Sequence, residues 1–148
     1  MKKIYLIIAV LFLIFRFNTF CLPSSSDITV NIENIESNDG NIRVHLYDES
    51  VKKYFPSNSD KAIKLEISKI SDNKAVVTFK NLPYGKYAVT VHHDKNLNIK
   101  MDKTFFGFPA EGWGVSNNIK PIMRLPKFSE CFFDDFKKTI SIKISMNN

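Results

Sequence analysis

Oxygen-bearing side chains occur at every second position of the segment HHDKNLNIKMD, directly after a run of alternating apolar residues. Four of them fall at positions one, three, five and nine of a loop: Asp94, Asn96, Asn98 and Asp102. Loops that bind calcium present oxygen ligands at this spacing, with a backbone carbonyl at position seven, which is Lys100 here. The spacing predicts a weak calcium site in residues 94–111, whose ligand shell Glu111 completes if it folds back onto the loop.

Two positions of this segment depart from the calcium-binding pattern. Position twelve is Phe105 instead of the bidentate glutamate that normally closes the ligand cage. Position six, where a sharp turn favours glycine, is Ile99, and a positive φ is costly for a β-branched residue. The alternative is that Asp94, Asn96 and Asn98 hydrogen-bond their own backbone in successive Asx-turns without any ion. The sequence leaves both interpretations open.

The same region offers the side chains of a hydrolase. His93 would act as general base, Asp94 or Glu111 as its partner, and Ser116 as nucleophile. No glycine-flanked serine elbow accompanies these residues, so such an enzyme is the alternative to a non-catalytic role. Neighbouring residues of a strand point to opposite faces, which places His92 and His93 poorly for sharing a metal. We expect His93 to be buried and hydrogen-bonded at the end of its strand.

Trp113 lies between two glycines, Gly112 and Gly114. Many binding modules use an aromatic residue on a glycine-rich loop as a platform for sugars or peptides. It could equally plug the open end of the fold, with three aromatic residues packed beneath it: Phe105, Phe106 and Phe108. The candidate ligand-binding residues are therefore His93, Glu111, Trp113, Ser116 and Asn117.

Alternating apolar and polar residues predict the strands that must position these side chains. Apolar side chains recur at every second residue in six segments, which span residues 28–32, 42–46, 63–67, 75–79, 87–91 and 140–146. A seventh strand is expected to include Phe132 and Phe133. The Asp-Gly turn at Asp39 and Gly40, between the first two segments, predicts that these two pair as a hairpin.

This pattern of about seven short strands without a helical period predicts an all-β fold, an antiparallel β-sandwich. One face of each strand is polar, so two sheets must hide their apolar faces against each other. Residues 94–130 lack regular alternation and form one long irregular loop. A connection of this length in a compact domain is usually functional, so we expect the functional site there.

The first residues have the composition of a secretory signal. Two lysines are followed by an uninterrupted apolar run over residues 4–15. The run is short for a bilayer-spanning helix, which needs about 20 residues, so cleavage is favoured over an uncleaved anchor. Residues 1–26 are therefore predicted to be a signal peptide or N-terminal anchor, and residues 27–148 one exported domain. Cys21 at the boundary offers lipidation as a further alternative.

The charge and the remaining cysteine suggest little about chemistry. The net charge is +6, with 21 basic and 15 acidic residues, but three basic and no acidic residues precede Asp27, which leaves 18 against 15 in the rest. This mild excess gives little support for nucleic-acid binding, which requires a basic stripe. Cys131, next to Phe132, is expected to be a small buried apolar residue and not a nucleophile.

Three motifs carry a resemblance to a known family: LPYGKY at residues 82–87, HDKNLN at 93–98 and GFPAEG at 107–112. The chain resembles the bacterial family of unknown function DUF2141 over Ile28 to Met146. The resemblance implies export and a β-sandwich related to prealbumin-like and Cna-B-like domains, without an established activity. One departure matters: Leu97 and Ile99 stand where glycines are common in the family loop.

The sequence thus predicts an exported protein of the periplasm, cell surface or medium, acting as a binding or structural module. Calcium is the only cofactor that the spacing suggests. The expected partner is a protein or glycan ligand and not a nucleic acid. Membrane contact is expected only through the N-terminal segment or a lipidated Cys21.

Overall fold

The computed structural model describes residues 25–120, 124–135 and 139–147. Its strands are β1 (Ser25–Glu33), β2 (Asn41–Asp48), β3 (Lys64–Ser68), β4 (Ala75–Pro83), β5 (Gly85–Asp94), β6 (Trp113–Val115), β7 (Phe133–Asp135) and β8 (Thr139–Ser145). The described helices are short: η1 (Lys52–Tyr54), η2 (Ser59–Lys61), η3 (Ser116–Asn118) and α2 (Phe128–Cys131). None of these helices is long and apolar enough to cross a bilayer. The predicted signal segment, with Cys21, lies almost entirely outside the described residues.

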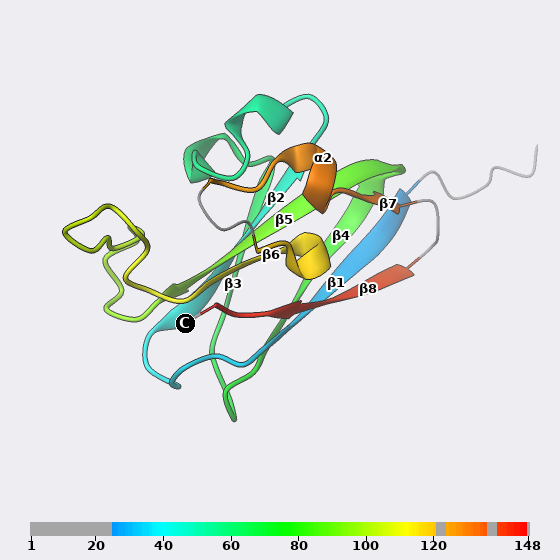
Figure 1. Cartoon of the computed structure of the whole chain (residues 1–148). Helices are drawn as coiled ribbons and strands as arrows, with labels where there is room; N and C mark the ends of the chain where they lie inside the picture. The colour runs from blue at the N-terminus through cyan, green and yellow to red at the C-terminus, as the bar shows by residue number, and fades with distance from the viewer. Residues whose placement is uncertain (1–24, 121–123, 136–138, 148) are drawn as a thin grey trace, which may run out of the picture.

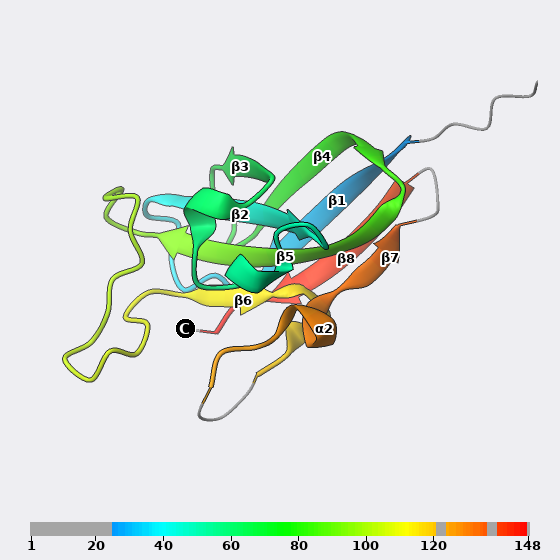
Figure 2. The ribbon, with the colours of Figure 1, turned by 90° about the horizontal axis from the view of Figure 1, so that it is seen from above.

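The strands form two facing sheets, as Figures 1 and 2 show. One sheet has the order β4-β1-β8, and the other has the order β3-β2-β5-β6, with β7 also paired to β5. Among the described strands, β1 and β8 pair in parallel, and all other pairings are antiparallel. The predicted all-β sandwich, mostly antiparallel, is therefore confirmed. The strand predicted to include Phe132 and Phe133 is β7, which contains Phe133, whereas Phe132 ends the helix α2.

The predicted hairpin between the first two strands is wrong, because β1 and β2 belong to different sheets. The connection between them crosses the sandwich through Ile35, which is buried and exchanges hydrogen bonds with Asn73 in the β3–β4 turn. Alternation fits either pairing, since both strands turn their apolar faces to the same core. Glycine is required in this turn for a different reason. Gly40 has φ +71°, and a Cβ there would lie 2.1 Å from the carbonyl oxygen of Asp94, too close for any side chain.

The core lies between the two sheets and contains the inward side chains of β1, β2, β4 and β5. Its buried apolar members include Ile28, Val30, Ile32, Ile42, Val44, Leu46, Val77, Phe79, Val89 and Val91. Each such side chain contributes roughly 1.5–3 kcal/mol through burial. These are the alternating residues from which the strands were predicted, so the inner face follows directly from the sequence.

A second apolar cluster lies on the outer face of the five-stranded sheet. The segment between β2 and β3 and the helix α2 lie on that face (Figure 1). The buried members of the cluster are Tyr47, Phe55, Ala88, Val115, Phe128 and Cys131. Cys131 is free and fully buried, as predicted, and burial raises the pKa of its thiol to about 12. Together these groups cover one end of the outer face.

The edge strand β3 departs from the expected burial pattern. Its alternating apolar residues Ile63, Leu65 and Ile67 are 37–51% exposed instead of facing the core. In register, Leu65 lies opposite His45 and Ile67 opposite Arg43, so both apolar side chains share the outer face with polar neighbours. Alternation identifies two faces of a strand, but it does not say which face is covered.

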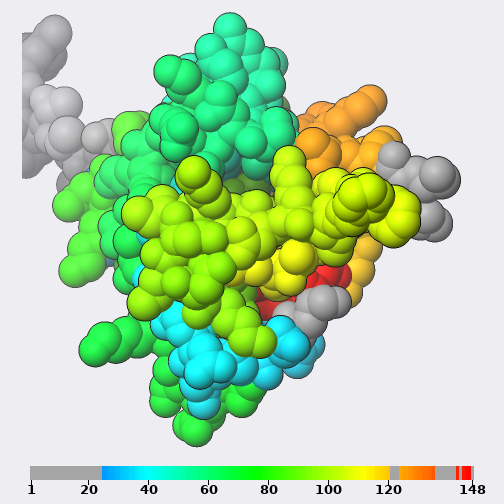
Figure 3. Space-filling view, turned by 90° about the vertical axis from the view of Figure 1, so that its left-hand side faces the viewer, coloured from blue at the N-terminus to red at the C-terminus, as the bar shows by residue number. Residues whose placement is uncertain are grey.

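Residues 95–112 leave the body of the sandwich after β5 and form a protruding loop, drawn in yellow-green in Figures 1 and 3. The loop is held by its own backbone: Thr104 donates to Phe108, Gly107 to Thr104, and Ala110 to Asp102. This is the first part of the long irregular connection expected from the sequence. The second part returns to the sheet as β6 and η3.

Candidate functional site at the rim of the outer sheet face

Cross-strand pairing gathers polar side chains on the uncovered end of the outer face. Asn41 pairs with Asp94, and Arg43 pairs with His92, which in turn pairs with Trp113 on β6. Residues directly opposite each other in a ladder point to the same face, so these rows place their side chains together. We call five of the ionisable groups there the rim cluster: Arg43, His45, His92, Asp94 and Glu111. All five side chains are buried, with exposed fractions between 1% and 11%.

Asp94 is the most deeply buried member of the rim cluster, with 1% of its surface exposed. Its Oδ2 accepts a hydrogen bond of 3.1 Å from the amide of Ile99 and lies 4.0 Å from Nη1 of Arg43. Among the described residues, its Oδ1 has no hydrogen-bonding partner, and the same holds for Oδ1 of Asn41 and Nε of Arg43. An unpartnered buried polar atom costs about 1–3 kcal/mol, and these three are two acceptors and one donor on neighbouring strands.

Glu111 folds back onto the start of the loop. Its Oε1 accepts from the amide of Lys95 at 3.0 Å, and its Oε2 accepts from the amide of Asp102 at 3.1 Å and from Nε2 of His92 at 2.8 Å. Burial raises the pKa of Glu111, but the hydrogen bonds from His92 and the two amides outweigh it and hold the pKa below its ordinary value. One carboxylate therefore ties both ends of the predicted cation loop to β5.

Within the loop, the predicted metal ligands do lie close together. Asp102 accepts from the side-chain amides of Asn96 and Asn98 at 2.6 and 3.0 Å. Oδ1 of Asn96 accepts from the amide of Asn98, and Oδ1 of Asn98 accepts from the amide of Lys100, each two residues ahead. These are the Asx-turns of the alternative interpretation. The described residues contain no group of three or more His, Cys, Asp or Glu side chains arranged to hold a metal.

Two loop residues adopt the backbone conformation that favours glycine. Leu97 has φ +62° and Ile99 has φ +74°, at the two positions where glycines are common in the resembling loops. An L-residue pays roughly 1–2 kcal/mol for this conformation, and a β-branched one pays most. Both residues therefore hold a backbone conformation that suits glycine better than leucine or isoleucine.

His93 lies on the opposite face of β5 from the rim cluster. It is 1% exposed, and its Nε2 donates to the backbone carbonyl of Asp39 at 2.9 Å. This is the buried, hydrogen-bonded position expected from the sequence. The hydrolase arrangement does not form, because the imidazole of His93 points away from Asp94, and the imidazole that contacts Glu111 belongs to His92.

The remaining predicted ligand-binding residues hold the returning chain in place. Oγ of Ser116 accepts from the amide of Val89 at 3.0 Å and donates to the carbonyl of Cys131 at 2.7 Å. The side-chain amide of Asn117 donates to two backbone carbonyls beside α2. Trp113 is half-buried against the second apolar cluster. The predicted plug is wrong in one respect, since the three loop phenylalanines are 63–99% exposed and none packs beneath Trp113.

Sequence reasoning missed two members of the rim cluster, Arg43 and His45. Burial lowers the pKa of His45 to about 4, and the neighbouring charges of Arg43 and His92 add to the effect. The signal was present in the sequence, because both residues alternate with the apolar side chains of their strand. It was indistinguishable from an ordinary solvated face until the neighbouring strands and the loop were placed around it.

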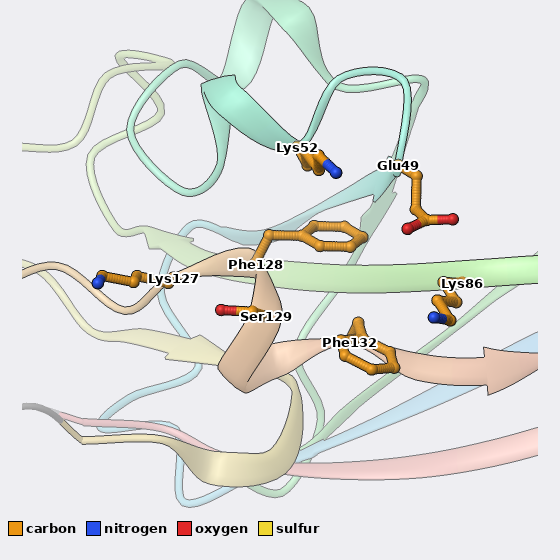
Figure 4. A pocket seen from close by; sticks show the side chains of 7 residues that line it. All are labelled: Glu49, Lys52, Lys86, Lys127, Phe128, Ser129 and Phe132. Carbon is orange, nitrogen blue, oxygen red and sulfur yellow. The ribbon is translucent and has the colours of Figure 1, made fainter.

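A separate pocket of about 350 Å³ lies at the other end of the outer face (Figure 4). Its lining residues are Glu49, Lys52, Lys86, Lys127, Phe128, Ser129 and Phe132. The rings of Phe128 and Phe132 stack with centroids 6.2 Å apart, and Nζ of Lys86 lies 4.9 Å from the centroid of Phe132. None of the residues predicted from the sequence lines this pocket.

Comparisons place the chain among known proteins at the level of family. No curated protein matches the sequence. A fimbrial assembly protein from Parabacteroides distasonis is similar over 82% of this chain and 52% of its own, with 10% identity and a TM-score of 0.42. A pilus-presented adhesin is similar over 86% of this chain and 28% of its own, with 10% identity and a TM-score of 0.25. The family model for an uncharacterized protein conserved in bacteria, DUF2141, matches residues 30–143, and the chain belongs to that family.

Proposed function

We propose that this protein is an exported binding module whose loop of residues 94–111 holds a calcium ion. One observation carries the proposal: the carboxylate of Asp94 is almost completely buried at the base of an oxygen-rich loop, and its Oδ1 has no partner among the described residues. Oδ1 of Asn41, across the strand pair, is a second unpartnered acceptor. A cation would give both acceptors a positively charged partner, in addition to the guanidinium of Arg43, whose Nη1 lies 4.0 Å from Oδ2 of Asp94.

The rest of the ligand shell would come from oxygens already near the loop. Asp102 contributes a second carboxylate, and Asn96 and Asn98 contribute amide oxygens in exchange for their present turns. Glu111 acts indirectly, by holding the amides of Lys95 and Asp102 in place. Two carboxylates in the shell and a nearby arginine predict weak binding, with a dissociation constant of about 0.1–1 mM, as in extracellular modules.

Thermal unfolding in a calcium titration tests this proposal. A ligand that binds only the folded state at tenfold excess over its dissociation constant stabilises by about 1.4 kcal/mol, or roughly 3–5 °C for a domain of this size. The informative variant is Asp94→Asn, which keeps an acceptor for the Ile99 amide but removes the charge. We expect it to abolish the shift. Asp134→Asn, an exposed acid on β7, is the matched control and should retain the shift.

Two results would contradict the calcium proposal. One is the absence of any shift at millimolar calcium in the parent protein, which would leave the Asx-turns as the full account of the loop. The other is an equal shift in Asp94→Asn and the parent, which would place the ion elsewhere. Magnesium serves as the ion control, because it requires tighter octahedral geometry than this loop offers.

Export rests on the charged and apolar start of the sequence. Mass spectrometry of the mature protein from its native cell tests it directly, since a cleaved chain begins near residue 27 and an acylated Cys21 adds the mass of its lipid. An intact first methionine on a cytoplasmic protein would contradict export. No reaction is proposed, because His93 and Glu111 do not meet.

A second candidate function is the binding of an acidic glycan in the pocket beside α2. Phe132, stacked on the buried Phe128, offers a half-buried ring that suits the C–H face of a sugar ring. In Figure 4 Lys52 lies above the ring of Phe128, and Nζ of Lys86 lies 4.9 Å from the centroid of Phe132. Glu49 is the one lining carboxylate against three lysines, so the pocket favours an anion. Calorimetric titration with oligogalacturonate tests it. Binding should weaken in Lys86→Gln and remain in Lys64→Gln, and no heat with the parent protein would refute it.

A further inference from the structure

The protruding loop exposes three large apolar side chains within four residues, which we call the loop tip: Phe105, Phe106 and Phe108. Their exposed fractions run from 63% to 99%, with Phe105 the most exposed. Figure 2 shows the loop in two lobes, residues 95–101 and residues 103–109, and the loop tip belongs to the second; Figure 3 views the molecule from the side of this loop. Phe105 and Phe106 meet edge-on with centroids 5.5 Å apart, and neither has another aromatic partner in the described chain.

An exposed cluster of this kind marks a contact surface. Soluble proteins rarely leave several large apolar groups together in water, because each loses the stabilisation that burial would bring. The three side chains come from one lobe of a loop that Glu111 and the loop's own hydrogen bonds keep in shape. Their exposure is therefore a property of the folded loop, and the contact is made by a protruding lobe.

The charges around the loop tip select an anionic partner. Lys103 is exposed two residues before Phe105 and pairs by its backbone with Pro109, beside Phe108; Lys100 is exposed in the first lobe, and neither lysine makes an ion pair within the described chain. Lys95 is also exposed and pairs with Glu36 at 3.3 Å. The acidic groups of the loop face inward: Asp94 and Glu111 are buried, and Asp102 accepts the amides of two asparagines.

We propose that the loop tip inserts into the surface of a lipid bilayer with anionic headgroups. A deformable interface accommodates a protruding apolar lobe without a complementary groove, and Lys103 reaches the headgroups while the phenylalanines enter the acyl boundary. The contact is separate from any N-terminal anchor, since β1 begins at the opposite end of the sandwich (Figure 1). It extends the proposed binding module by naming a partner, and no step of it uses the calcium ion.

Vesicle co-sedimentation of the full protein tests the proposal. Vesicles of phosphatidylglycerol and phosphatidylethanolamine should bind the protein, and phosphatidylcholine vesicles should bind it much less. The double variant Phe105→Ala with Phe106→Ala should weaken binding by about tenfold or more, because it removes the most exposed apolar area. The matched control Leu65→Ala with Ile67→Ala removes exposed apolar side chains from β3 and should bind like the parent.

A depth measurement separates insertion from simple adhesion. In a Trp113→Phe background, which removes the single tryptophan of the chain, Phe105→Trp places a fluorophore at the loop tip. Brominated lipids should quench it strongly. Equal binding of the phenylalanine double variant and the parent would overturn the proposal and assign binding to the N-terminal segment. Absence of binding to any vesicle, or no quenching at position 105, would overturn it as well.

Calcium distinguishes this proposal from the proposed ion site. Vesicle binding is expected both with calcium and with a chelator, since the loop is closed by protein hydrogen bonds alone. A thermal shift with calcium but no vesicle binding would overturn the membrane contact and leave the ion site standing. Vesicle binding without a thermal shift in calcium would support the membrane contact and contradict the ion site. Capture by a protein, with no binding to lipid, would also overturn the membrane contact.

Discussion

Replacing Ile99 by glycine should make the protein more stable, although the substitution removes a large side chain. Ile99 is 66% exposed and has φ +74°, in the left-handed region that L-residues with branched Cβ atoms occupy at greatest cost. Its amide donates to Asp94, and glycine keeps this donor. The substitution therefore relieves strain without opening a cavity or breaking a hydrogen bond.

The expected gain is the difference between two effects of opposite sign. Relief of the left-handed conformation is worth about 1–2 kcal/mol, with a β-branched residue at the upper end. Glycine lowers the free energy of unfolding by roughly 0.5–1 kcal/mol, because it gives the unfolded chain more conformational entropy to lose on folding. The net stabilisation is about 1 kcal/mol, which corresponds to a rise of roughly 3 °C in the melting temperature.

Urea unfolding of the parent and of Ile99→Gly, followed by circular dichroism, measures this difference at equal slope. Val76→Gly is the matched control, because Val76 is also β-branched and 55% exposed but lies in the extended strand β4. There glycine should destabilise by about 1 kcal/mol. The reasoning is refuted if both substitutions destabilise alike, since position 99 would then carry no backbone strain that glycine can relieve.

Two further predictions concern groups buried in the outer face. The pKa of His45 is lowered to about 4, from 6.5 in the unfolded chain, so the unfolded state binds more protons between these pH values. The free energy of unfolding is therefore full above pH 6.5 and falls by up to about 3 kcal/mol as the pH drops to 4. Denaturant titrations at several pH values across this window should show this pH dependence in the parent and not in His45→Gln; an unchanged pH dependence in the variant would assign the protons to another group. Ser116→Ala should cost about 2–3 kcal/mol in unfolding free energy, because the amide of Val89 and the carbonyl of Cys131 lose their buried partner. A silent Ser116→Ala in thermal unfolding would mean that the hydroxyl does not tie the chain to β5.

The inner face of the sandwich was predictable because it depends on a period of two and little else. Ile28, Val44 and Val89 are buried where alternation put them, and His93 follows the same phase into the interior. Pairing was harder to predict. The turn before β2 has the composition of a hairpin, yet the buried Ile35 carries the chain across to the other sheet. Local turn chemistry cannot decide between two partners that bury the same face.

The outer face could not be predicted, because its burial comes from distant segments. Arg43 and His45 look like solvated residues in the sequence, and they become buried only when β5, β6 and Glu111 are placed around them. The loop residues were recognised as a group, since oxygen-bearing side chains at alternate positions are a local signal. Their partner Glu111 was also recognised, although its contact with His92 was not expected from strand alternation.

The end of β5 is where the requirements of the fold and those of the rim site separate. His93 and Asp94 are neighbours, and each is 1% exposed. His93 donates to the carbonyl of Asp39 in the turn before β2, whereas Asp94, on the outer face, keeps an acceptor without a partner among the described residues. Gly40 presses so closely on the carbonyl of Asp94 that no side chain fits there, which fixes the point at which the loop departs. A fold selected for stability alone would not place a buried, half-satisfied carboxylate at this rigid position. The strain at Ile99 and the exposed phenylalanines beyond it also cost stability, and under the proposed membrane contact this cost holds one shaped loop in front of its partner.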